Sequence, residues 1–185
     1  MVCFLDGNAI FLGRHAYYPP VWDDMRVPAN TAIAGSNPPT LSVFVGTVRA
    51  WHFSATVVES LHFEAQISHR YKEGTDIQPH IHWSPTSAAA GTVSWGLEYT
   101  VATPTVQFPT TSTLSVAAVS GGTARLHQVD GLGTISMAGN KISTMIVGRV
   151  YRNAPADTYP DLAVLHEIDF HFQVDTPGSK QPFLK

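Results

Sequence analysis

Imidazole and carboxylate side chains alternate with apolar side chains in several segments of this sequence. His80 and His82 are two residues apart in the segment 77–83, so they project from the same face if this segment is a strand. Imidazole and carboxylate groups together bind zinc and other transition metals. The polar residues of two similar segments, 61–68 and 93–100, provide carboxylates. The candidate ligands for a metal are therefore His80, His82, Glu64 and Glu98.

The same polar face has other interpretations. His80-Ile81-His82 is similar to the start of a cupin-like metal site, but the glutamate that should follow is replaced by residues 83–86 (WSPT), and no later segment supplies the last ligand. The residues can instead form a hydrogen-bonded ladder between strands, or line a symmetric subunit interface. We predict no cofactor and no metal. If the segment 162–174 joins the same sheet, the group also gains Glu167, Asp169 and His171.

Catalytic motifs are scarce in this sequence. The single cysteine, Cys3, has no local partner and can form no internal disulfide, and there is no G-x-S-x-G nucleophile elbow. Glu167 and Asp169 are a carboxylate pair of the kind that glycosidases use, but alternation on a solvent-facing strand produces such pairs by default. We therefore predict that the protein is not an enzyme. The remaining enzyme alternatives are a cupin-like metalloprotein and a glycan hydrolase.

Composition limits the possible partners. Only 14% of the 185 residues are charged, where about a quarter is usual, and this suggests that part of the surface is covered by other subunits. The net charge of −3 argues against a nucleic-acid partner, which requires clustered Lys and Arg. No apolar run approaches the ~20 residues that span a bilayer, and the start of the chain lacks the basic region of a signal peptide. We predict no membrane partner.

Strand signals dominate from residue 41 onward. Segments of alternating or β-branched residues are separated by turns rich in Gly, Pro, Ser and Asp, and no window has a helical period. This pattern predicts an all-β fold, a two-sheet antiparallel β-sandwich that is jelly-roll-like, with an immunoglobulin-like Greek key as the alternative. The segments 61–68, 77–83 and 93–100 are predicted to form an antiparallel meander.

The first part of the chain differs from the rest. Residues 1–40 are rich in proline and aromatic residues, which argues against helix and central strand, yet they are too apolar for a solvated tail. We predict an extended arm over residues 1–40, packed on its own sandwich or on a neighbour, and a jelly-roll-like domain over residues 41–185. The interface candidates are Tyr17, Tyr18, Trp22, Trp51, Trp83, His62 and His171.

Five segments carry a resemblance to a known family. They are 22–28 (WDDMRVP), 71–76 (YKEGTD), 79–85 (PHIHWSP), 93–99 (VSWGLEY) and 169–176 (DFHFQVDT). In this order they resemble a family of small structural proteins that is widespread in tailed bacteriophages. The resemblance extends from about Trp22 to the end of the chain, and it brings no catalytic residues with it.

The resemblance implies a component of the virion, assembled in the host cytoplasm. Capsid decoration (cement) proteins of phages are often jelly rolls or β-sandwiches that assemble as trimers. We therefore expect a homotrimeric decoration protein whose partners are the major capsid protein and further copies of itself. The alternative is a sandwich protein of the tail or fibres whose exposed aromatic residues contact host receptor glycan.

Overall fold

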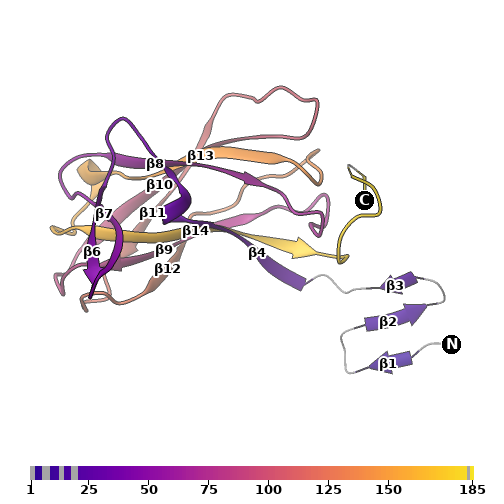
Figure 1. Cartoon of the computed structure of the whole chain (residues 1–185), viewed down its shortest axis with the longest axis horizontal. Helices are drawn as coiled ribbons and strands as arrows, with labels where there is room; N and C mark the ends of the chain where they lie inside the picture. The colour runs from indigo at the N-terminus through magenta and orange to yellow at the C-terminus, as the bar shows by residue number, and fades with distance from the viewer. Residues whose placement is uncertain (1–2, 6–8, 13–14, 18–20, 183) are drawn as a thin grey trace.

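The computed structural model describes residues 3–5, 9–12, 15–17, 21–182 and 184–185, with side chains from residue 21 onward. The predicted fold class is confirmed: antiparallel sheets pack into a sandwich (Figure 1), and the described residues contain no α-helix. The described part of the chain also contains two short 3-10 helices, η1 (Ala29–Thr31) and η2 (Ala154–Ala156). No helix of the described part is long and apolar enough to cross a membrane.

The strands of the sandwich pair in a nested order. Of the strands from β7 onward, β7 (Val48–Phe53) pairs with the last, β14 (Ala163–Val174), and β8 (Glu59–Gln66) pairs with β13 (Met145–Arg152). Likewise β9 (Gln78–Pro85) pairs with β12 (Gln128–Gly131), and β10 (Thr92–Ala102) with β11 (Ser112–Val119). This is one long antiparallel ribbon folded over itself, which is the topology of a jelly roll.

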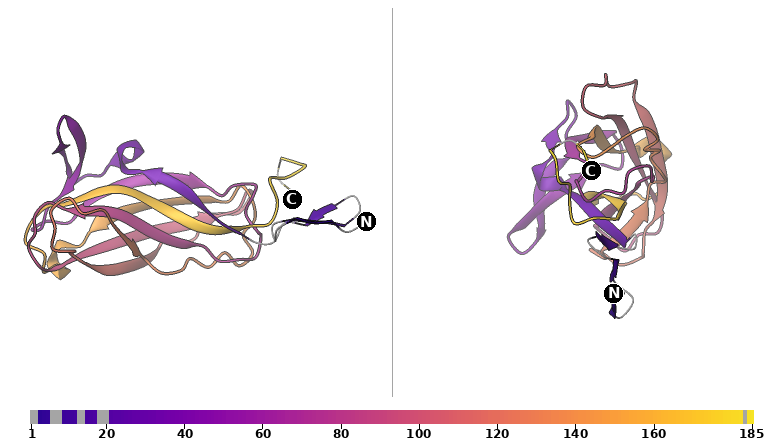
Figure 2. Two further views of the ribbon diagram at one scale, coloured as in Figure 1. Left: turned by 90° about the horizontal axis from the view of Figure 1, so that it is seen from below. Right: turned by 90° about the vertical axis from the view of Figure 1, so that its right-hand side faces the viewer.

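Two further pairings join the nested pairs into two sheets. β9 pairs with β14, which gives the order β12-β9-β14-β7-β6, where β6 is Thr40–Val45. β10 pairs with β13, which gives the order β11-β10-β13-β8-β5, where β5 is Ile33–Ala34. The sheets lie face to face along the length of the molecule (Figure 2).

Alternation of side chains along the strands builds the core between the sheets. In β8, Leu61, Phe63 and Ala65 are buried while His62 and Glu64 are exposed, as the period of two predicts. The predicted meander is nevertheless wrong, because β8 and β10 both pair with β13, whereas β9 lies in the opposite sheet. A period of two shows which face of a strand is buried, but it does not show which strand is the neighbour.

The segment predicted as an arm is extended, but its second half belongs to the sandwich. β4 (Val21–Pro28) pairs along β14 as an edge strand, and β5 pairs with β8. Val27 and Ala29 are part of the core. The described residues before β4 form a separate three-stranded sheet of β1 (Cys3–Leu5), β2 (Ala9–Leu12) and β3 (His15–Tyr17). The boundary predicted after residue 40 therefore falls too late, since the sandwich already begins at β4.

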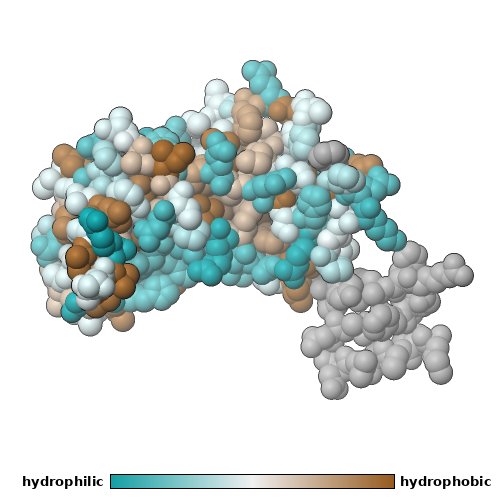
Figure 3. Space-filling view, in the orientation of Figure 1, coloured by the Kyte–Doolittle hydropathy of each residue, from teal (hydrophilic) through white to brown (hydrophobic). Residues whose placement is uncertain are grey.

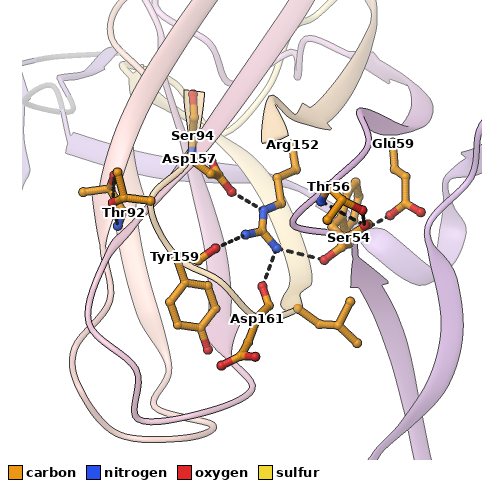
Figure 4. A network of polar contacts seen from close by, with 12 residues as sticks. Ser54, Thr56, Glu59, Thr92, Ser94, Arg152, Asp157, Tyr159 and Asp161 are labelled. Carbon is orange, nitrogen blue, oxygen red and sulfur yellow. Dashed lines mark hydrogen bonds and ion pairs between the residues drawn. The ribbon is translucent and has the colours of Figure 1, made fainter. Parts of the chain in front are cut away.

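A buried arginine organises one end of the sandwich (Figure 4). Arg152 is fully buried at the end of β13, and its guanidinium pairs with the Asp157 carboxylate. It also donates to the backbone carbonyls of Phe53, Asp161 and Tyr159 at 2.8–2.9 Å. These bonds connect β13 with the end of β7 and with the loop that leads into β14. Every buried charge in this cluster therefore has partners, as a stable interior requires.

Candidate functional site

Histidine and carboxylate side chains gather on the outer face of β9 and β14. The register places His80 opposite Asp169 and His82 opposite Glu167, while Ile81 and Ile168 face the core. The C-terminal strand lies beside β9, so the condition under which Glu167, Asp169 and His171 join the face of His80 and His82 is met. The neighbouring β4 and the residue before β12 contribute Asp24, Arg26 and His127 to the same face.

A β-bulge in β14 increases the number of polar groups at this point. The register with β9 shifts between Leu165 and Glu167, so the extra residue His166 turns to the outer face together with Glu167. His166 Nε2 is hydrogen-bonded to Ser84 Oγ at 2.8 Å. A hollow of about 550 Å³ lies over the sheet at this point. Its lining residues are Asp24, Arg26, Pro28, His80, His82, His127, His166, Glu167 and Asp169.

Asp169 lies at the centre of the hollow between two imidazoles. His82 Nε2 donates to Asp169 Oδ2 at 3.2 Å, and His80 Nε2 lies 2.9 Å from Oδ1. The ring N–H of His80 does not point at Oδ1, and among the described residues this buried oxygen has no hydrogen-bond donor. His82 Nδ1 is hydrogen-bonded to His127 Nε2 at 2.9 Å. The central carboxylate is thus only partly satisfied.

The rim of the hollow carries two ionic pairs that are better satisfied. Arg26 donates to both oxygens of Glu167 at 2.8–3.0 Å. His171 Nδ1 donates to Asp24 Oδ1 at 2.5 Å, and the Trp22 ring stacks on the His171 ring at 4.7 Å between centroids. The rim carboxylates therefore have partners of their own, which leaves Asp169 as the carboxylate available to a ligand.

Burial shifts the pKa of two groups in the hollow. It raises the pKa of the Asp169 carboxyl above its ordinary value, against the opposing attraction of His80 and His82. It lowers the pKa of His166, and repulsion from His127 and His82 acts in the same direction. The hollow is therefore a place where a positive charge next to Asp169 is favourable and a further proton on His166 is not.

The predicted metal set is only half present. Glu64 and Glu98 lie on the outer face of the opposite sheet, on β8 and β10, so they cannot approach His80 and His82. Glu98 is engaged by Arg149 and by Thr111, and these bonds lower its pKa, the Arg149 bond being the stronger cause. Period-two reasoning grouped the four residues because it assumed that the strands were neighbours in one sheet.

Some site residues were not predicted at all. His127 and His166 were not among the candidates, and Arg26 and Asp24 were placed in the arm. One signal was present, since the run Leu165-His166-Glu167-Ile168 puts two polar residues in succession inside an otherwise alternating strand, which indicates a bulge. His127 precedes a strand of only four residues, and nothing in its local sequence indicates its position.

The predicted interface residues have different outcomes. Trp83 is fully buried and donates to Asp130 Oδ2 at 2.7 Å, so its prediction as an interface residue is wrong. Trp51 is partly buried, His171 is partly covered by Trp22, and His62 is exposed. Trp22 is 45% exposed. Tyr18 and the side chain of Tyr17 lie outside the described residues.

Exposed apolar side chains gather on the hairpin of β6 and β7. Val43, Val45 and Val48 are 59%, 47% and 61% exposed. Val45 and Val48 are direct cross-strand partners, so their side chains lie together on one face of the hairpin. The hairpin projects from the sandwich at the upper left of Figure 2, and apolar atoms gather over it at the left of Figure 3. We call Val43, Val45 and Val48 the valine tip.

No protein-family model and no curated protein matches the chain. A family 35 carbohydrate binding module from Clostridium thermocellum is 10% identical, with 80% of this chain and 97% of that chain covered and a TM-score of 0.44. The isomalto-dextranase of Arthrobacter globiformis T6 is 15% identical with a TM-score of 0.42, and the match covers 80% of this chain but only 23% of that enzyme.

A viral structure is also among the matches. The structure of the infectious bursal disease virus Gx strain is 15% identical, with 97% of this chain and 37% of that chain covered and a TM-score of 0.40. All three TM-scores are below 0.5. The assignment of the fold rests on the strand order of this chain itself.

Proposed function

We propose that this chain is a structural protein of a virus particle, and specifically a capsid decoration protein that stabilises the head shell by protein–protein contacts. The observation that carries the proposal is the valine tip, an apolar group held out on a projecting hairpin. Burying a valine side chain contributes about 1.5–3 kcal/mol of favourable free energy. The valine tip gains this free energy when it packs against another protein and not when it faces water.

Other features support the same role. The sandwich is a jelly roll, and the chain has few charged residues. The resemblance of five of its segments to tailed-phage structural proteins implies the same role. A decoration protein that binds the assembled shell, and not the free subunits, stabilises the shell by mass action. The proposed partners are the major capsid protein and two further copies of this chain in a homotrimer.

The direct test is the copy number of the chain in purified particles, measured by quantitative mass spectrometry against the major capsid protein. A ratio comparable to the capsid protein is the expected result. A ratio lower by an order of magnitude or more assigns the chain to the tail or fibres, and absence from the particle contradicts a virion role altogether.

The valine tip can be tested separately. The double variant Val45→Ser with Val48→Ser should fold normally, because both side chains are exposed, and should bind undecorated heads far more weakly. Val119→Ser is a matched control, since Val119 is 64% exposed on a different strand, β11. Equal binding by the double variant and the control contradicts the role given to the tip.

The role of the predicted arm can be tested by a truncation that leaves the sandwich intact. Removing residues 1–38 would also remove β4 and the core residues Val27 and Ala29, so a loss of binding would be uninformative. A chain that begins at Val21 keeps the whole sandwich. If this shorter chain still decorates heads fully, residues 1–20 have no role in attachment.

A second candidate function is glycan binding by a tail or fibre protein, and the exposed ring of Trp22 favours it. Aromatic rings of this kind stack on sugars. Soluble protein should then inhibit adsorption of the phage to its host, and Trp22→Ala should abolish the inhibition. Decoration of the head lattice by the same protein excludes this alternative.

A further inference from the structure

We propose that His80, His82 and Asp169 form a binding site for a divalent transition metal, with Zn²⁺ as its preferred occupant. The ligand atoms of the three residues lie within 4.8 Å of one another, on the outer face of the sheet. Two imidazoles and one carboxylate are a ligand set that zinc and other first-row metals accept. This site is independent of the proposed role in the virion.

The unpaired carboxylate oxygen is a second, separate observation. Asp169 is nearly inaccessible, with 4% of its side chain exposed, and its Oδ1 has no hydrogen-bond donor among the described residues. Leaving such an atom unpaired costs about 1–3 kcal/mol, and more for a charged group. A cation between Asp169 and the two imidazoles satisfies this oxygen, which no described side chain does.

The backbone holds the three ligands in place before any metal binds. His80 and His82 are two residues apart on β9, and Asp169 is the direct partner of His80 on β14. Both strands are interior strands of the six-stranded sheet. Sites on paired strands are held more precisely than sites on loops, so little conformational entropy is lost when a metal binds.

The surroundings of the ligands fit a metal site as well. His82 Nδ1 contacts His127 Nε2 at 2.9 Å, and His80 Nδ1 faces the Gln78 carbonyl at 3.4 Å. Contacts of this kind on the far ring nitrogen orient a histidine so that its other nitrogen can bind a metal. The hollow above the site leaves room for a fourth ligand such as a water molecule.

The charges around the site favour a cation. Glu167 is paired with Arg26 and Asp24 with His171, so these carboxylates do not compete for the metal. Asp169 contributes one negative charge to the metal, and the two neutral imidazoles are the other protein ligands. A bound cation would offset the cost of holding the Asp169 carboxylate nearly buried on an outer face.

The test is isothermal titration of the full chain, freed of metal by chelation, with Zn²⁺ at neutral pH. We expect one Zn²⁺ per chain, at least about 100-fold weaker binding for Asp169→Asn, and about 10- to 100-fold weaker binding for His127→Ala. His62→Ala is the control, since His62 is exposed on the opposite sheet, and it should bind like the wild type.

Co²⁺ provides a second readout, because its visible absorption reports the ligands and the geometry around the ion. The wild type should show the intense bands of a low-coordinate nitrogen–oxygen site, and His80→Gln and Asp169→Asn should not. Circular dichroism of each variant without metal checks that it is folded. Equal Zn²⁺ affinity in the wild type and in both folded variants overturns the proposal, as does the absence of stoichiometric binding by the wild type.

Discussion

Two clusters of polar side chains in this sandwich each contain a buried carboxylate. They differ in whether both oxygens of that carboxylate have hydrogen-bond donors. Asp157 and Asp169 are carboxylates with only 3% and 4% of their side chains exposed. Asp157 faces Arg152, which also donates three hydrogen bonds to backbone carbonyls. Asp169 faces two imidazoles, and one of its oxygens has no donor among the described residues.

The difference separates a structural role from a binding role. A guanidinium is always charged, so the Arg152 cluster is permanently neutralised and needs nothing from outside. Imidazole nitrogens are common metal ligands, and one oxygen of Asp169 has no donor among the described residues, so this cluster is open to a ligand. The Arg152 cluster is enclosed between loop and strand ends, whereas the Asp169 cluster opens into a hollow.

The largest expected effect comes from breaking the complete cluster. Arg152→Leu leaves the buried Asp157 carboxylate with the Ser94 N–H but without its charged partner, and it removes the Arg152 donors from three carbonyls. It should lower the free energy of unfolding by about 3–5 kcal/mol. Urea denaturation measures this change. Arg149→Leu is the control, because the partly exposed Arg149–Glu98 pair should contribute about 1 kcal/mol or less. Similar losses in the two variants would contradict the role given to Arg152.

The next effect comes from filling the incomplete cluster. Zn²⁺ at about 100 times its dissociation constant should raise the free energy of unfolding of the wild type by about 2.7 kcal/mol, because it binds only the folded chain. Chelation should reverse the gain without unfolding the protein, since the core does not depend on the metal. Denaturation with and without Zn²⁺ measures it, and an equal gain in Asp169→Asn would refute the assignment.

A smaller effect is expected from Asp169→Asn in the absence of metal. The substitution removes a buried charge that is poorly satisfied, so the free energy of unfolding should change by less than about 1 kcal/mol, or increase. This outcome is the opposite of that for Arg152→Leu at similar burial. A loss of several kcal/mol would mean that Asp169 is structural and that the two clusters do not differ in kind.

The smallest effect concerns Glu59, which lies beside Arg152 (Figure 4). Burial raises its pKa, although the Ser54 N–H and Arg152 act against the shift. A carboxyl with a raised folded-state pKa contributes stability that is present below its ordinary pKa and is lost as the pH rises through the raised value.

Glu59→Gln should remove this loss of stability at higher pH, because a glutamine side chain does not ionise. Between about pH 4 and pH 7, the stability of the variant relative to the wild type should increase by about 1 kcal/mol or less. Denaturation at both pH values measures the change, and a relative stability that falls over this range would show that the Glu59 charge is stabilising.

Much of the fold could be predicted because alternation reports burial directly. The apolar residues 61, 63, 65 and 67 are inside the sandwich, and the jelly-roll class followed from many short strands. Strand neighbours could not be predicted, because pairing in a jelly roll joins segments more than a hundred residues apart, such as β7 and β14. The error about the meander and the error about Glu64 and Glu98 have this single cause.

The candidate site was predictable in part. His80 and His82 were identified from their spacing, and Asp169 was identified on the condition that β14 lies beside β9. The outward position of His166 results from a bulge in β14, and the position of Arg26 results from the pairing of β4 along β14. This pairing was not predicted, because the prolines of the N-terminal segment argue against a strand. Single-residue features of this kind follow from tertiary packing and not from a local period.

The most direct test of the contrast between the clusters is anomalous diffraction at the zinc absorption edge from crystals of the full chain grown with Zn²⁺. We predict one strong anomalous peak within bonding distance of His80 Nε2, His82 Nε2 and the Asp169 carboxylate, with the Arg152 cluster unchanged. Anomalous peaks confined to other surface histidines, with Asp169 still unliganded, would contradict the account.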